Sequence, residues 1–173
     1  MSVFLSRPVP EQFYRLPRKG VLSFGFDRGL RTRGPRKGSH HYHQGIDIVA
    51  PVGTDLYALY DGRVRQVHNA KSGPRRGFGG YGRIVVIEYT GGLFSLYAHC
   101  DTIVVAEGDA VHAGMLVAAI GRTAFRVDAP DHLCGAHVHL ELAWTGYPKP
   151  LDRKPADWGR IDPSAYLTAN VRS

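Results

Sequence analysis

The chain has 173 residues, which fits one domain with a modest appendage and leaves little room for two full cores. Its 43% hydrophobic content is ordinary for a globular protein, and Gly 21 and Pro 11 favour short strands and tight turns over long helices. The formal charge is +7, and no apolar stretch is long enough to cross a membrane.

The first segment, residues 1–42, carries nine Lys or Arg against Glu11 and Asp27, which equals the whole excess of positive charge. We expect a basic irregular arm packed on the domain, with a short strand at residues 21–26. Such an arm can hold an anionic polymer such as bacterial cell wall, or it can simply be a solvated segment. Nucleic acid is not expected as a partner, because the chain has the charge but no recognisable nucleic-acid-binding motif.

Four strands are predicted between residues 56 and 99. Residues 56–60 and 63–67 flank Asp61-Gly62, a strong turn signal, and predict a first hairpin. Residues 83–89 and 93–99 are joined by Thr90-Gly91-Gly92 and predict a second hairpin.

Short strands continue towards the C-terminus. Glycine-containing turns at 107–109 and 112–114 bound two of them, the second at 116–120, and residues 137–142 alternate polar and apolar side chains. We therefore predict an all-β fold, a small antiparallel sheet or sandwich with a groove, as a domain spanning residues 43–173. The tail from residue 148 is expected to wrap the outside.

The pair His43 and Asp47 has a spacing that constrains how it can act. Gly45 and the β-branched Ile46 argue against a helix, and on a straight strand the two side chains would lie about 13 Å apart. One metal ion cannot span that gap with ligand bonds of about 2 Å. The pair is compatible with a metal only if a bend at Gly45 makes it a loop that runs into a strand.

The segment His137-Val138-His139 places two imidazoles on one face of a strand, with Cα atoms about 6.6 Å apart. That distance suits one ligand and one ring beside the metal-bound water, and the spacing does not decide which histidine is which. With His43 and Asp47, one of the pair completes a two-histidine, one-carboxylate zinc site with an open position. Zinc held in this way activates water and polarises a carbonyl.

His99 ends the predicted strand at 93–99. Together with the remaining histidine of the pair, it is suited to orient water, take its proton and stabilise a tetrahedral intermediate. Each of these signals is weak alone, and their combination among predicted strands points to metal-assisted hydrolysis.

The sequence resembles the lysostaphin/LytM-type zinc metallopeptidases, which cleave peptidoglycan peptides. The resemblance runs from about residue 45 to residue 167, and its densest motifs are His43-Gln44-Gly45-Ile46-Asp47-Ile48, Tyr81-Gly82-Arg83-Ile84-Val85, Tyr97-Ala98-His99, Gly135-Ala136-His137-Val138-His139-Leu140-Glu141 and Asp162-Pro163.

The resemblance implies one Zn²⁺ per chain, bound by His43, Asp47 and His139, with His99 and His137 as catalytic histidines. It implies a zinc-dependent endopeptidase that hydrolyses peptide bonds in peptidoglycan cross-links or stem peptides. The alternative is a non-catalytic metal- or wall-binding module of the same fold, which would need neither His99 nor His137. Peptidoglycan is the expected partner, and a monomer is the default.

Three remaining expectations concern surroundings and location. Glu141 shares a predicted face with His137 and His139, so it is expected either to hydrogen-bond a histidine or to lie at the surface. Cys100 and Cys134 are expected to be buried or unpaired thiols rather than a disulfide or a structural zinc site. The site of action is expected outside the cytoplasm, although no signal peptide is visible, which leaves lysis or a dedicated secretion machine as the route.

Overall fold

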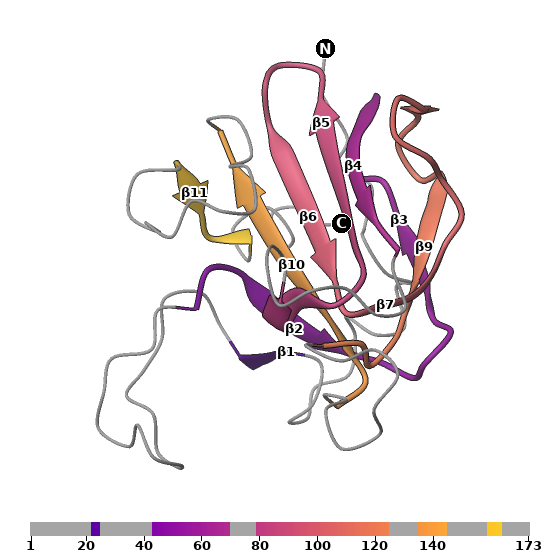
Figure 1. Cartoon of the computed structure of the whole chain (residues 1–173). Coiled ribbons are helices and arrows are strands. Elements are labelled where there is room, and N and C mark those ends of the chain that lie inside the picture. Colours follow the sequence, from indigo (N-terminus) through magenta and orange to yellow (C-terminus); the bar gives the residue numbers. More distant parts are fainter. Residues whose placement is uncertain (1–21, 25–42, 70–78, 125–134, 145–158, 164–173) are drawn as a thin grey trace, which may run out of the picture.

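The structure is a computed structural model, and it describes residues 22–24, 43–69, 79–124, 135–144 and 159–163. Apart from a short 3-10 helix, η2 (Gly79–Tyr81), the named elements of these residues are strands, as Figure 1 shows. The prediction of an all-β antiparallel fold is therefore confirmed. In the same residues, no helix has the length and apolar character of a membrane span.

Two antiparallel sheets make up the fold. The larger one has the order β1-β2-β10-β6-β5-β4-β8, with β11 paired to β10. Its strands are β1 (Leu22–Phe24), β2 (Ile46–Val49), β10 (His137–Ala143), β6 (Phe94–Ala98), β5 (Ile84–Tyr89), β4 (Gly62–His68), β8 (Ala110–Val111) and β11 (Arg160–Ile161). The smaller sheet has the order β3-β9-β7, formed by β3 (Asp55–Tyr57), β9 (Leu116–Ile120) and β7 (Cys100–Ile103).

The main hydrophobic core contains side chains of both sheets. From β10 it takes Val138, Leu140 and Leu142, and from the small sheet it takes residues such as Leu56 and Val117. Because side chains alternate along a strand, the other face of β10 carries His137, His139 and Glu141. Alternation on β10 thus places its core side chains on one face and the residues of the candidate site on the other.

The face of the large sheet that carries these residues has its own small apolar cluster. Ile84, Val86, Leu96 and Ala98 form it, and Tyr81 packs against it. Ala98 on β6 lies directly opposite His139 on β10. A small buried apolar cluster therefore lies beside the histidines on this face.

The first predicted hairpin is wrong. β3 pairs with β9 in the small sheet, whereas β4 pairs with β5 and β8 in the large sheet. The connecting residues Ala58 and Leu59 are fully buried, so the apolar run passes between the sheets instead of turning back at the surface. Gly62 is needed for a different reason: a Cβ there would lie 2.3 Å from the Glu88 carbonyl oxygen on β5.

The second predicted hairpin is confirmed. β5 and β6 pair in the register Val85↔Tyr97 and Val86↔Leu96, and Gly91 and Gly92 in their turn both have positive φ. The strand predicted at 116–120 and the one predicted at 137–142 correspond to β9 and β10.

The N-terminal and C-terminal segments each contribute a strand. β1 pairs with β2, so part of the predicted basic arm is an edge strand of the large sheet, and β11 pairs with β10. Cys100 is a free thiol in the core, where burial raises its pKa to about 12. Cys134 lies outside the described residues. Of the predicted arm, residues 1–42, the structure describes residues 22–24.

Candidate metal centre

An open pocket of about 410 Å³ lies over β2 and β10, at the end where η2 approaches the sheet. Eight residues line it: His43, Gln44, Asp47, Gly80, Tyr81, His99, His137 and His139. All five residues predicted for the site are among them. These five come from three separate segments of the sequence, and Gly80 and Tyr81 belong to a fourth.

Strand pairing brings Asp47 and His139 together. The two residues are direct partners between β2 and β10, and His139 Nδ1 lies 2.8 Å from Asp47 Oδ1. His43 precedes β2, and its Nε2 lies 3.2 Å from the same Asp47 oxygen. The motif is thus a loop that runs into a strand, as expected: His43 precedes β2 and Asp47 lies on it.

Gly45 allows this arrangement because it lies against the backbone of β10. A Cβ at this position would lie 2.1 Å from the Leu140 carbonyl oxygen. Any larger residue would push the loop that carries His43 away from β10, and with it the imidazole that faces Asp47.

Donor atoms of His43, Asp47 and His139 all lie within 4.8 Å of one another. Two imidazole nitrogens and one carboxylate oxygen are donors that zinc accepts, and the open pocket leaves room for a further ligand. Burial opposes ionisation of Asp47, but hydrogen bonds and charge interactions with His139 and His43 outweigh it and hold the pKa of Asp47 well below its usual range. The carboxylate is thus available as an anionic donor. The residues present fit the metal that the sequence predicts.

His139 is buried and has a partner at each ring nitrogen. Nδ1 faces Asp47, whereas Nε2 lies 3.1 Å from Glu141 Oε1. Burial lowers the pKa of His139, but the hydrogen bonds to the two carboxylates outweigh burial and raise it to about 9 in the metal-free protein. Of the two expectations for Glu141, the hydrogen bond to a histidine is confirmed.

His99 and His137 lie next to each other in the pocket, with ring centroids 4.5 Å apart. His99 Nδ1 lies 2.7 Å from the Thr123 carbonyl oxygen, and His137 Nδ1 lies 2.7 Å from the Gly135 carbonyl oxygen. A carbonyl only accepts, so each Nδ1 is a protonated nitrogen that donates, and Nε2 is the ring nitrogen left to face other groups. His137 Nε2 lies 3.8 Å from Asp47 Oδ1.

The backbone of His99 adopts φ 63°, a left-handed conformation that is rare for residues other than glycine. Its amide donates to the Tyr81 carbonyl, and its ring donates to the Thr123 carbonyl. Burial, with a smaller contribution from His137, lowers the pKa of His99 to about 4. His99 is therefore neutral at neutral pH and able to accept a proton.

Several residues of the site carried no role in the sequence-based reasoning. Gln44, Gly80 and Tyr81 line the pocket, Thr123 binds His99, and Arg160 binds Glu141. Tyr81 lies in a motif of the family resemblance, which was the one signal that could have singled it out. Nothing in the sequence indicates that Arg160 reaches this region.

The family model described as "Peptidase family M23" matches residues 41–152. The murein hydrolase activator NlpD of Escherichia coli is 29% identical over 137 residues, which are 79% of this chain and 30% of NlpD. The DD-carboxypeptidase/endopeptidase Mpg of Neisseria meningitidis is 34% identical over 106 residues, 61% of this chain and 21% of Mpg. The chain thus spans less than a third of the length of each of these curated relatives.

Among solved structures, a zinc-containing peptidase from Vibrio cholerae superposes with a TM-score of 0.59 at 27% identity. The alignment covers 82% of this chain and 36% of that chain.

Proposed function

Because the chain belongs to peptidase family M23, the family of the lysostaphin-type peptidases that its motifs resemble, we propose that it is a zinc metalloendopeptidase acting on peptidoglycan. Its substrates are peptide bonds in the cross-links or in the stem peptides of the bacterial wall. The observation that carries the proposal is the shared pocket: a three-donor cluster and two further histidines line one open cavity.

In this proposal His43, Asp47 and His139 hold one zinc ion. When bound, zinc supplies Lewis-acid chemistry, since it polarises a carbonyl and lowers the pKa of a coordinated water towards about 7. The name of the Vibrio cholerae structure, a zinc-containing peptidase, supports this choice of metal.

His99 and His137 carry the proton chemistry. His99 is neutral because burial lowers its pKa, and its Nε2 is free to accept a proton from the attacking water. His137 lies beside His99 in the pocket, where its ring orients the substrate carbonyl and, once protonated at Nε2, donates to the oxygen that gains negative charge. Neither ring needs to bind the metal for these roles.

The substrate proposal is supported by the names of the relatives. Mpg is named a DD-carboxypeptidase/endopeptidase, which refers to cleavage of peptide bonds, and NlpD is named a murein hydrolase activator, which refers to murein. The proposed site of action is therefore extracytoplasmic, at the wall, and the positive charge of residues 1–42 is suited to an anionic wall polymer.

The alternative function is a non-catalytic, wall-associated module, and the similarity to NlpD favours it. That protein is named an activator of hydrolases, not a hydrolase. The two functions differ in what they require of the pocket, because an activator has no need for His99 and His137 beside the donor cluster. The presence of all five residues favours catalysis.

Zinc content and wall hydrolysis, measured side by side on the wild-type protein and His99→Ala, test the proposal. We expect about one zinc per chain in both, with release of new amino groups from purified walls only by the wild type. Walls of several cross-link types are needed. One zinc without hydrolysis of any wall by the wild type would instead support the activator.

A further inference from the structure

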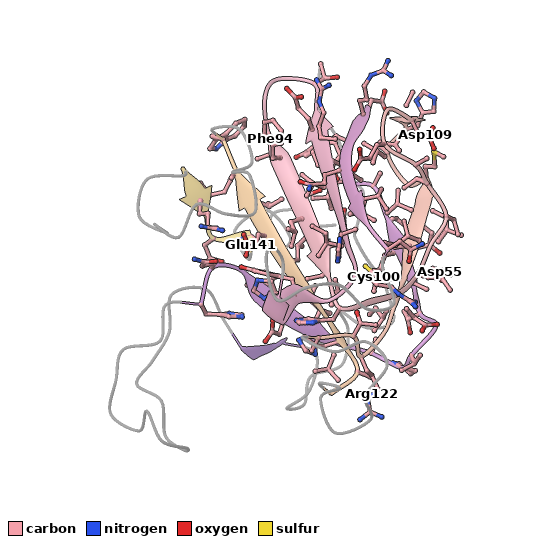
Figure 2. All side chains as sticks on the ribbon, viewed as in Figure 1. Asp55, Phe94, Cys100, Asp109, Arg122 and Glu141 are labelled. Carbon is pink, nitrogen blue, oxygen red and sulfur yellow. The ribbon has the colours of Figure 1, made fainter. Side chains whose placement is uncertain are left out.

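Glu141 is a fully buried carboxylate on β10 that the proposed reaction does not use. Figure 2 labels it beside β10, between the two ends of that strand. It does not line the pocket, yet it lies two residues beyond His139 on the same face. Burying a carboxylate is costly unless other groups compensate it, so its contacts indicate what it is for.

The first contact is with His139. Glu141 Oε1 lies 3.1 Å from Nε2, while Nδ1 of the same ring points at Asp47 Oδ1 from 2.8 Å. An ionised carboxylate accepts only, so Nε2 must carry a proton and donate it. That leaves Nδ1 as the nitrogen whose lone pair can face the donor cluster. Glu141 thereby selects which ring nitrogen is available to a metal.

The second contact links Glu141 to the pocket wall. The Tyr81 hydroxyl lies 2.6 Å from Glu141 Oε1 and 2.7 Å from the side-chain oxygen of Gln44. A phenol has one proton, so it cannot donate to both. Turning the Gln44 amide round resolves the conflict, because its nitrogen then donates to Tyr81 while Tyr81 donates to Glu141. Two pocket-lining residues are thus connected to the carboxylate.

The third contact provides the charge that balances Glu141. Arg160 Nε donates to Glu141 Oε2 at 2.8 Å, and the Arg160 side chain is only 8% exposed. Arg160 lies on β11, which pairs with β10 in the register Leu142↔Ile161. A short strand from the C-terminal segment therefore supplies a cation to the far side of the proposed metal ligand.

We propose that Glu141 is a positioning residue for His139, held by Arg160 and Tyr81, and that it fixes the imidazole so that Nδ1 faces the metal. This inference rests on the proposed function, since it assumes zinc at the donor cluster. Carboxylates that accept the second N–H of a ligating histidine fix its tautomer and orientation, and their loss weakens metal binding about 10–100-fold.

The competing explanation is that Glu141 and Arg160 form only a structural ion pair that fastens β11 to β10. A buried ion pair broken at one partner destabilises the fold whichever partner is lost. Under that explanation, stability changes on substitution but the zinc affinity of the folded protein does not. Zinc affinity therefore separates the two roles, provided that folding is measured alongside.

The experiment compares Glu141→Gln, Tyr81→Phe and the matched control Glu88→Gln, with wild type, in chelator-competition titrations of zinc. Glu88 forms an ion pair with Arg65 on the same sheet, outside the pocket. We expect zinc affinity to fall about 10-fold or more in Glu141→Gln and less in Tyr81→Phe. Glu88→Gln should match the wild type. Thermal unfolding of each protein without metal shows whether it is folded.

Because Glu141→Gln removes the carboxylate charge beside Arg160, the double variant Glu141→Gln with Arg160→Gln provides a second route if the single variant does not fold. We expect the double variant to fold with weakened zinc binding. At saturating zinc, we expect kcat to fall, because Glu141 no longer positions His139. We expect KM to change little, because Glu141 does not line the pocket.

Wild-type zinc affinity in a folded Glu141→Gln protein would overturn the positioning role and leave the proposed peptidase function intact. If the wild type itself bound no zinc and cut no wall, the proposed function would fail first. The two failures are thus distinguishable.

Discussion

Asp47 and His139 are direct cross-strand partners, and this one pairing joins the two motifs of the candidate metal centre. They lie 92 positions apart in the sequence, yet the β2–β10 register sets them opposite each other, with Nδ1 and Oδ1 2.8 Å apart. Directly opposite residues in an antiparallel pair have Cβ atoms about 5 Å apart, close enough for both side chains to reach one ion. The site therefore depends on sheet register as much as on the residues themselves.

Removing His43 should abolish zinc binding. His43→Ala deletes one of three donors, and the remaining two cannot hold the ion against a chelator of moderate strength. Zinc content after dialysis against such a chelator checks this, with His112→Ala as the control, since His112 is exposed and lies outside the pocket. Full zinc occupancy in His43→Ala would exclude His43 from the ligand set.

Removing His137 should leave zinc bound and reduce hydrolysis. We expect His137→Ala to keep about one zinc and to lose about 10²–10⁴-fold in hydrolysis rate, because the substitution removes a proton-handling group and no ligand. Zinc content and release of amino groups from walls are measured on the same sample. Loss of zinc in parallel with activity would contradict the role assigned to His137.

Gly45→Ala should weaken zinc binding through the backbone. The new Cβ would meet the Leu140 carbonyl at 2.1 Å, so the loop carrying His43 must shift, at a cost of about 1–3 kcal/mol in stability. Gly53→Ala is the matched control. That substitution strains the backbone, because Gly53 has φ 86°, but nothing lies within 4 Å of the added Cβ. Only Gly45→Ala should lower zinc affinity in a chelator titration.

Zinc binding at pH 7 should release about one proton. Burial lowers the pKa of His139, but Asp47 and Glu141 raise it to about 9 overall, so the metal-free protein holds a proton that zinc must displace from Nδ1. Apparent zinc affinity should therefore rise between pH 6 and pH 9. Calorimetry in two buffers of different ionisation enthalpy measures the released protons, and a value near zero at pH 7 would contradict this.

The same shift predicts how stability of the metal-free protein depends on pH. Since the folded pKa of His139 lies above its usual 6.5, protonation stabilises the fold fully below pH 6.5. That contribution is lost as the pH rises through about 9. Thermal unfolding of the metal-free protein between pH 6 and pH 10 should show the decline, and His139→Gln should lack it.

The basic residues near the N-terminus should strengthen wall binding at low salt. Replacing Arg7, Arg15, Arg18 and Lys19 with glutamine tests this by charge alone and leaves β1 in place, whereas deletion through residue 36 would remove that strand from the sheet. We expect weaker co-sedimentation with purified walls at low ionic strength and no difference at high salt. Unchanged binding at low salt would indicate that the arm is simply a solvated segment.

The sequence was sufficient for the elements whose signal is local. The β5–β6 hairpin follows from two β-branched runs around Thr90-Gly91-Gly92, and the two faces of β10 follow from alternation. Local patterns failed at Asp61-Gly62, because a turn signal does not reveal that the flanking strands belong to different sheets. Whether a strand turns back or crosses depends on non-local pairing.

For the candidate site, the sequence by itself selected the side chains to which we assign the proposed chemistry: His43, Asp47, His99, His137 and His139. Motif spacing required a bend at Gly45 and left the choice between His137 and His139 open. Only the tertiary structure decided that Nδ1 of His139 faces Asp47, because that orientation depends on strand register. Only the tertiary structure also brought Glu141, Tyr81 and Arg160 together, because a buried carboxylate selects its partners by proximity in space, which no spacing along the chain encodes.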